Sequence, residues 1–270
     1  MTASQVGFGV YFLQLIGSLV LNALAAIGRG FHVFCGILCN LNHCWKRRRE
    51  IVEQMHIMVV GSLPLVVTTA AFTGAITAVQ TGYQMKAYVP MIFLGTVVAK
   101  SVILEMGPVL AALVVGSRLS ANYAAELGTM KVTEQLDAME IMAIDPVQYL
   151  GLPRFVAAVL MMPVITVIAD LIAIMGGLVV SIITLEVTVQ TFTEGMRLFW
   201  EIGDVITGVG KTFFFGGIIA MSGIYHGFNT QGGAEGVGRA TMQAVVGTCL
   251  SVLVADYILN TIFMQIIFGG

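Results

Sequence analysis

Long apolar runs separated by short polar stretches dominate the pattern of this sequence. Five runs are each long enough to cross a bilayer core as a helix, which takes about 20 residues. They lie at about 57–82, 89–117, 152–185, 205–228 and 241–268. Their apolar positions are continuous rather than alternating, which favours helices over the strands of a membrane barrel. The sequence therefore predicts an all-α integral membrane protein with five transmembrane helices.

The apolar segment at residues 6–27 has a different pattern. Polar or charged residues recur along one side at near-helical spacing: Gln14, Ser18, Asn22 and Arg29. Large apolar residues lie mainly on the other side: Phe12, Leu15, Ile16, Leu19 and Leu24. A helix with one polar and one apolar face is typical of an element in the membrane interface, although hydropathy alone also permits a span. We predict an N-terminal interfacial helix.

A polar, acid-rich segment at about 124–142 separates the second apolar run from the third. Its apolar positions share one face: Leu127, Met130, Leu136 and Met139. We predict a single helix that ends before Asp145, because the residue that precedes a proline avoids the helical region. Two interpretations fit this helix. It is either a solvated connection between spans or a coupling helix that inserts into a groove on a soluble partner.

Composition and charge support the membrane class and predict an orientation. The chain is 57% hydrophobic and only 10% charged, whereas soluble domains carry about 25% charged residues. The formal net charge of −2 gives no reason to expect nucleic acid as a partner. The basic run 46–49 precedes the first span, and cytoplasmic loops are enriched in Lys and Arg. We therefore predict a cytoplasmic N-terminus, a cytoplasmic 124–142 segment and a periplasmic C-terminus.

Several contiguous motifs resemble one family of membrane proteins. The longest is 126–139, and the others are 104–110, 116–118, 144–146, 153–154, 176–177, Lys211 and 238–241. Together they resemble the MlaE (YrbE) permease family, the membrane subunits of ABC transporters that work with MCE-domain proteins. The resemblance covers roughly residues 50–270. It divides the chain into an N-terminal interfacial helix with a basic elbow at 1–50 and a five-span permease domain at 51–270.

The resemblance implies a transport subunit rather than an enzyme. It implies a homodimer in the bacterial inner membrane, two ABC ATPase subunits below it, and an MCE-protein assembly on its periplasmic side. The expected cargo is phospholipid. ATP and Mg²⁺ belong to the ATPase, so this chain is expected to hold no catalytic residue, metal or cofactor. The residues expected to couple the chain to the ATPase are Glu126, Gly128, Met130, Thr133, Glu134, Asp137 and Met139.

Ionisable residues within the apolar runs are a second set of candidates: Lys100, Glu105, Asp170 and Asp256. A charge at membrane depth costs several kcal/mol unless it is paired or hydrated. Glu105 matches a family glutamate that the resemblance places near the lipid cavity, and a purely structural carboxylate is the competing interpretation. For Asp170 and Asp256 we predict a structural role, in which each pairs with a basic residue on a neighbouring helix.

The predicted substrate-binding residues are Glu105, Lys100, Leu104 and Pro108. Leu104 stands where some family members have an arginine, and Lys100 is the candidate replacement for that cation. Lys100 precedes Glu105 by five residues, which is roughly 140° around a helix, so the two are not expected to pair. Pro108 lacks an N–H and frees the carbonyl of Leu104, which predicts a kink.

One further lysine lies in a misleading pattern. Residues 207–212 resemble part of a phosphate-binding loop, but Val205 occupies the position of the first glycine that such a loop requires. Nucleotide binding by this chain is therefore not expected. Lys211 is instead predicted to mark the outer end of the fourth span and to extend toward the lipid headgroups.

Two other functions compete with the ABC permease. The first is a proton-coupled secondary carrier that uses Glu105, Asp170 and Asp256 as a relay. Such carriers contain inverted repeats, and no internal repeat is apparent in this sequence. The second is an intramembrane enzyme, which requires a nucleophile–base pair or a metal set. No convincing constellation of that kind is present in the sequence.

Overall fold

The structure is a computed structural model of the chain, and it describes residues 17, 21, 28–41, 44–86 and 88–268. These residues are mainly helical, with no strand among them. The elements, with η for a π-helix, are α2 (Arg48–Met85), α3 (Phe93–Ser101), η2 (Val102–Met106), α4 (Gly107–Val132), α5 (Gln135–Ile141), η3 (Val147–Gly151), α6 (Leu152–Leu185), α7 (Val189–Leu198), α8 (Ile202–Phe228) and α9 (Gly233–Phe268).

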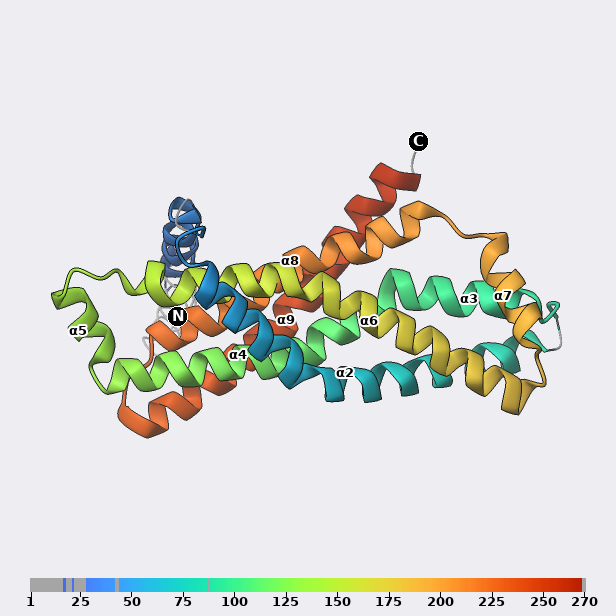
Figure 1. Ribbon diagram of the computed structural model, residues 1–270, viewed down its shortest axis with the longest axis horizontal. Helices are drawn as coiled ribbons and strands as arrows, with labels where there is room; N and C mark the ends of the chain where they lie inside the picture. The colour runs from blue at the N-terminus through green and yellow to red at the C-terminus, as the bar shows by residue number, and fades with distance from the viewer. Residues whose placement is uncertain (1–16, 18–20, 22–27, 42–43, 87, 269–270) are drawn as a thin grey trace, which may run out of the picture.

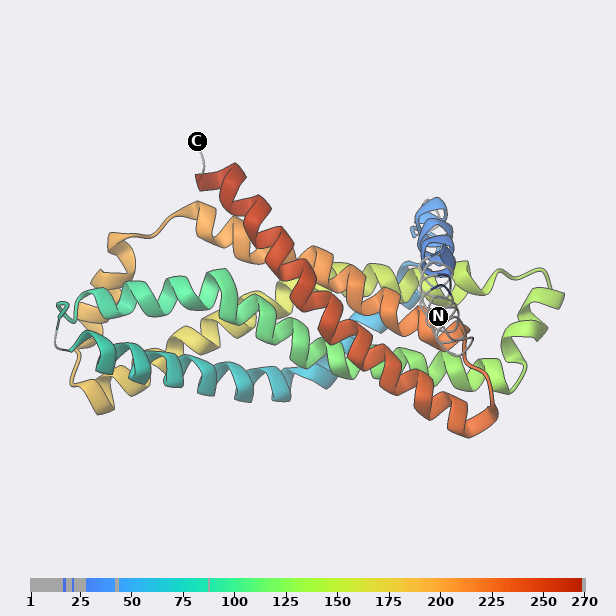
Figure 2. The same ribbon diagram turned by 180° about the vertical axis from the view of Figure 1, so that it is seen from behind.

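The helices form one elongated bundle (Figure 1). α5 lies at one end of the bundle and α7 at the other, and these are called the α5 end and the α7 end. α2 packs along α6, while α4 packs against α8 and α9. Figure 2 shows α9 crossing the back of the bundle obliquely, with its C-terminal part diverging from the other helices.

Five helical stretches are long and apolar enough to cross a membrane: Arg48–Met85, Phe93–Val132, Val147–Leu185, Ile202–Phe228 and Gly233–Ile266. The prediction of a multi-pass membrane protein with five spans is therefore confirmed. In four of these stretches the helix begins before the predicted apolar run. Polar residues at a span end continue the helix without interrupting its hydrogen bonds, and hydropathy does not detect them.

The N-terminal region is described only in part. The predicted interfacial helix at 6–27 lies outside the described residues, apart from residues 17 and 21. Residues 28–39 are helical and lie across the long axis of the bundle at the α5 end in both views (Figures 1 and 2). There Phe34 packs edge-on against Phe155 of α6, with ring centroids 6.0 Å apart.

Glycines allow α2 and α6 to approach closely. A Cβ atom on Gly74 would overlap the backbone carbonyl of Ala173, and one on Gly176 would overlap the backbone carbonyl of Ala71. Small residues at such crossings let helix backbones come into van der Waals contact, which is a main source of helix association in membranes. Gly176, which belongs to one of the motifs found in the sequence, thus serves the packing of α6 against α2.

The short helix α7 was not predicted. The hydroxyl of Thr188 caps it by accepting a hydrogen bond from the Thr191 N–H at 3.2 Å. Its buried Phe192 and the Gly195 carbonyl, which accepts a hydrogen bond from Thr96, attach it to α3. The helix covers 10 residues of mixed polarity, so no apolar run marks it, but the threonine cap before a buried aromatic was a usable signal.

α9 is the least buried of the five spans. In the most apolar 18-residue stretch of α9, 11% of the residues are buried, against 50% in the corresponding stretch of Val147–Leu185. The exposed face is lined by large apolar side chains: Met242, Val246, Leu250, Val254, Tyr257 and Ile258. A face of this kind must be covered by lipid or by another protein surface.

Candidate functional site

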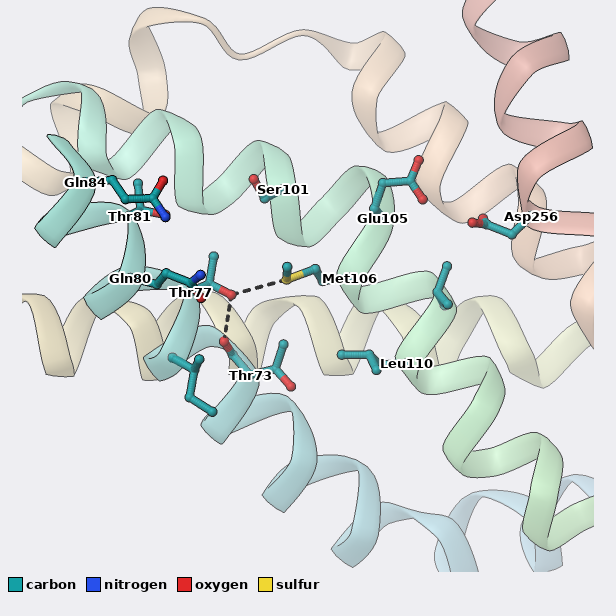
Figure 3. Close-up of a pocket in the computed structure, with 12 residues that line it drawn as sticks. Thr73, Thr77, Gln80, Thr81, Gln84, Ser101, Glu105, Met106, Leu110 and Asp256 are labelled. Atoms are coloured by element: carbon teal, nitrogen blue, oxygen red, sulfur yellow. Dashed lines mark hydrogen bonds between the residues drawn. The ribbon is translucent and has the colours of Figure 1, made fainter. Parts of the chain in front are cut away.

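An open cavity of about 640 Å³ lies between α2, the η2–α4 junction and α9 (Figure 3). Its wall combines polar and apolar side chains, which are Thr73, Ile76, Thr77, Gln80, Thr81, Gln84, Ser101, Glu105, Met106, Val109, Leu110 and Asp256. Such a mixture is typical of a ligand pocket, in which a few polar groups orient a largely apolar ligand. This cavity is the candidate functional site.

One polar face of α2 forms much of the cavity wall. It consists of Thr73, Thr77, Gln80, Thr81 and Gln84. Four of these residues follow the spacing i, i+4, i+7 and i+11, which places them on one side of a helix. This face was not predicted, because the candidate substrate-binding residues were the ionisable side chains of the apolar runs and the motif around Glu105. The regular spacing of amides and hydroxyls within an apolar run was a sufficient signal.

Three charged side chains form an ion-pair group beside the cavity. The Lys211 Nζ lies 2.9 Å from Glu105 Oε2 and 2.8 Å from Asp256 Oδ1. Lys211 is fully buried, whereas 39% of the Glu105 side chain and 17% of the Asp256 side chain are exposed. The group links η2, α8 and α9, which are separated along the chain and meet only in the folded bundle. The pairing predicted for Asp256 is confirmed.

The location of Lys211 corrects the sequence prediction. The residue does not extend from the end of α8 toward headgroups but lies inside the bundle with 0% of its side chain exposed. An isolated buried ammonium is strongly unfavourable, and two adjacent carboxylates compensate for its lost hydration. The sequence showed the lysine near one end of a span but did not show that two acids from other helices surround it.

A π-helix positions Glu105. η2 spans Val102–Met106 and ends with the Gly107 N–H donating to the Val102 carbonyl. Pro108 follows at once and has no N–H, so the regular α-helical pattern fails at the carbonyl of Leu104. Figures 1 and 3 show the chain bending between α3 and α4, as the proline predicted. The irregular turn presents Glu105 and Met106 to the cavity.

The other predicted substrate residues lie elsewhere. Lys100 pairs with Asp204, at 3.2 Å, and with Glu201, at 3.9 Å, on the side toward α8. It does not pair with Glu105, as the helical geometry predicted. Among the four candidates, Glu105 lines the cavity, whereas Lys100, Leu104 and Pro108 do not. Pro108 acts on the site through the backbone.

Asp170 is buried on α6 against the η2–α4 junction. Its Oδ1 atom lies so close to Gly107 that a Cβ there would overlap it. Within the described residues it forms no ion pair, and Oδ1 has no hydrogen-bond partner. The predicted basic partner is therefore not found for Asp170. The carboxyl group fits a space that only a glycine leaves open.

The acid-rich segment at 124–142 is not a single helix, which corrects the sequence prediction. α4 continues to Val132, and α5 begins at Gln135. Between them Glu134 adopts a left-handed conformation, with φ of 60°, and this turns the chain. A Lys131–Asp137 ion pair of 2.6 Å closes the turn. The sequence did not indicate this break, because no glycine or proline marks it and polar residues of high helix propensity lie around it.

The predicted coupling residues divide by exposure. Glu126, Thr133 and Glu134 are exposed, and Met130, Asp137 and Met139 are partly buried. Gly128 is buried, and a Cβ there would press on Thr230 in the α8–α9 connection. At the C-terminal end of α5, Ile141 and Met142 are highly exposed apolar side chains, at 87% and 63%. This apolar tip was not predicted, although an adjacent isoleucine and methionine stand out in a polar stretch of the sequence.

A second buried cation, Arg154, lies at the α5 end. Its Nη2 donates to Glu126 Oε2 at 2.9 Å, and its Nη1 donates to the Leu150 carbonyl at 3.1 Å. The guanidinium carbon is 5.7 Å from the ring centroid of Tyr123. Arg154 thereby joins α6 to the last turns of α4. One of the expected ATPase contacts, Glu126, is thus engaged within the chain.

The cavity and the spans define the class of the protein. A bundle of five helices long and apolar enough to span a membrane, with an open cavity and buried ion pairs beside it, is typical of a membrane transport protein. The family model of Permease MlaE matches residues 51–262. The chain therefore belongs to the MlaE permease family and is a permease component of an ABC transporter.

Named relatives agree with this assignment. A probable ABC transporter permease protein of Rickettsia prowazekii is 38% identical over 216 residues, covering 80% of this chain and 83% of the relative. A similar probable permease of Synechocystis is 35% identical over 218 residues, covering 81% and 83%. The intermembrane phospholipid transport system permease protein MlaE of Haemophilus influenzae is 32% identical over 255 residues, covering 94% and 97%.

Proposed function

We propose that this chain moves phospholipid between the inner membrane and a periplasmic MCE-protein assembly, using ATP hydrolysed by a separate ABC ATPase. The observation that carries the proposal is the open cavity with Glu105 and Asp256 in its wall, both paired with the buried Lys211. The name of the Haemophilus influenzae relative, an intermembrane phospholipid transport permease, supports phospholipid as the cargo.

The cavity suits an amphipathic ligand. Its polar groups come from one face of α2 and from the ion-pair group, while Ile76, Val109 and Leu110 offer apolar surface for acyl chains. A head held by polar groups and tails held by apolar ones is the division that a phospholipid requires. The exposed apolar face of α9, which adjoins the cavity at Asp256, supports a homodimer in which a second copy completes the enclosure.

Coupling is assigned to the α5 end. The exposed tip formed by Ile141 and Met142, with the exposed acidic Glu134 at the other end of α5, suits insertion of this end into a groove on the ATPase. Motion applied to α5 passes through the Lys131–Asp137 pair to α4, and through Glu126 and Arg154 to α6. The α5 end is accordingly cytoplasmic and the α7 end periplasmic, and residues 28–39 belong to the interfacial helix.

The alternative is a proton-coupled carrier that uses Glu105, Asp170 and Asp256. Glu105 and Asp256 share Lys211, whereas Asp170 packs against Gly107 and does not line the cavity. The three carboxyl groups therefore do not form one chain of proton sites along the cavity, and membership in an ABC permease family further favours the ATP-driven function.

The test is reconstitution of the full chain in lipid vesicles with and without its ATPase. We expect ATP-dependent lipid movement only when the ATPase is present. Glu134→Lys should uncouple movement from ATP hydrolysis, because it places a cation on the docking surface, while membrane insertion remains normal. Glu194→Lys, an equally exposed change on α7 at the opposite end, is the matched control. Lipid movement by the chain alone, driven by a pH gradient, would contradict the proposal.

A further inference from the structure

The wall of the cavity carries more acid than base. Lys211 is fully buried between Glu105 and Asp256, whereas both carboxylates line the cavity. One ammonium compensates for one carboxylate, so the three groups together retain one negative charge. The described residues include every lysine and arginine of the chain, and among them none lines the cavity.

The nearest candidate cation along the chain is occupied elsewhere. Lys100 immediately precedes the cavity residue Ser101, but its ammonium lies 3.2 Å from the buried carboxylate of Asp204. Withdrawal of Lys100 from Asp204 would leave that carboxylate buried without its partner, which is costly. The charge at the cavity is therefore the one net negative charge of the Glu105–Lys211–Asp256 group.

Two hydroxyl groups of α2, those of Thr73 and Thr77, add acceptors rather than donors. Thr73 donates its hydroxyl hydrogen to the Thr69 carbonyl at 2.8 Å, and Thr77 donates to the Thr73 carbonyl at 2.8 Å. A hydroxyl group has one hydrogen, so each of these oxygens offers lone pairs to a ligand in the cavity. The N–H donors on α2 are the side-chain amides of Gln80 and Gln84. Figure 3 shows these amides on one side of the cavity, with Glu105 and Asp256 on the other.

We propose that this cavity selects a phospholipid whose head carries a primary ammonium and no net negative charge over anionic phospholipids. The inference rests on the proposed function of the cavity as the lipid site and adds the class of head that it accepts. The ammonium faces Glu105 and Asp256, where its three N–H groups meet acceptors. The phosphate faces the amides of Gln80 and Gln84. An anionic head would bring uncompensated negative charge against the two carboxylates.

The experiment measures competition for the full chain purified in detergent. A fluorescent phosphatidylethanolamine is displaced by unlabelled phosphatidylethanolamine, phosphatidylcholine or phosphatidylglycerol with identical acyl chains. We expect phosphatidylethanolamine to compete about tenfold better than phosphatidylglycerol, as one charge contact in a partly hydrated cavity implies. Phosphatidylcholine should rank between them, because its quaternary ammonium keeps the charge but has no N–H.

Two variants change the net charge of the cavity, each at a different wall. Glu105→Gln removes one carboxylate, and Gln80→Lys adds a cation without altering the ion-pair group. Each should bring the ratio between phosphatidylethanolamine and phosphatidylglycerol close to one. Glu201→Gln is the control, because it removes a carboxylate near Lys100 that does not line the cavity, and it should leave the ratio unchanged.

The outcomes separate the inference from the function on which it rests. If the native chain binds phosphatidylglycerol as tightly as phosphatidylethanolamine, or if Gln80→Lys and Glu105→Gln both leave the preference intact, the headgroup inference is wrong while the lipid site stands. If no lipid competes for the native chain, the proposed lipid site fails and the headgroup inference fails with it.

Discussion

Lys211 and Arg154 are both buried cations, yet their surroundings differ. Lys211 is held by two carboxylates from η2 and α9 in a cavity wall. Arg154 is held by one carboxylate, one carbonyl of the preceding π-helix η3 and the Tyr123 ring at the α5 end. The first arrangement leaves an excess of negative charge that a ligand can meet. The second is balanced and fastens α4 to α6, which suits the transmission of motion.

The largest effect is expected for Lys211→Met, which leaves two carboxylates facing each other without their cation. Loss of one partner from a buried ionic group costs about 3–5 kcal/mol. We expect a marked fall in the thermal unfolding temperature of the detergent-purified chain and loss of lipid movement. Lys86→Met, at an exposed position after α2, is the control and should unfold like the native chain.

A triple variant refines this prediction. Lys211→Met combined with Glu105→Gln and Asp256→Asn removes all three charges together, so most of the lost stability should return. Lipid movement should stay absent, because the cavity has lost its charged wall. A triple variant no more stable than Lys211→Met alone would show that packing around the lysine, not charge compensation, holds this region together.

A smaller loss of stability is expected for Arg154→Met. Its partner Glu126 remains 46% exposed and is hydrated after the change, so we expect a cost of about 1–3 kcal/mol, in the range of one charged hydrogen bond. The larger consequence should be functional: more ATP consumed for each lipid moved by the reconstituted transporter. Rescue by the exchange Arg154→Glu with Glu126→Arg tests the contact itself, and failure of the exchange to restore coupling would leave Arg154 with a packing role only.

The contrast between the two cations also shows what the sequence could predict. Apolar runs predicted all five spans, because hydropathy and length depend on local residues alone. The pattern of charged residues selected Glu105 and the 124–142 segment, and the family resemblance supplied an expected role for each. The partner of Glu105 could not be predicted, because Lys211 lies 106 positions further along the chain and no spacing rule relates the two residues. The polar face of α2 could have been predicted from its regular spacing. The break at Glu134 could not, because the residue in the left-handed conformation is not a glycine.

Asp170→Asn extends the comparison to a buried acid that has no cation. Replacing an unpaired buried carboxyl with a neutral amide of similar shape should change stability by about 1 kcal/mol or less, with stabilisation the expected sign. Lipid movement should remain within about twofold of the native rate, since Asp170 does not line the cavity. A transporter that loses all movement with this variant, while folding normally, would favour the proton-coupled carrier.

The smallest effect is expected for Tyr123→Phe, beneath Arg154. The Tyr123 hydroxyl is buried and has no hydrogen-bond partner within the described residues, so its removal deletes a polar group that contributes no contact. The ring that faces the guanidinium is retained. We expect a change within about 0.5 kcal/mol and normal coupling, whereas Tyr123→Leu should lose the cation–π contact, about 0.5–2 kcal/mol. Thermal unfolding of both variants measures the difference. If Tyr123→Phe is as damaging as Tyr123→Leu, the hydroxyl rather than the ring supports Arg154, and the arginine is held by polar contacts alone, as Lys211 is.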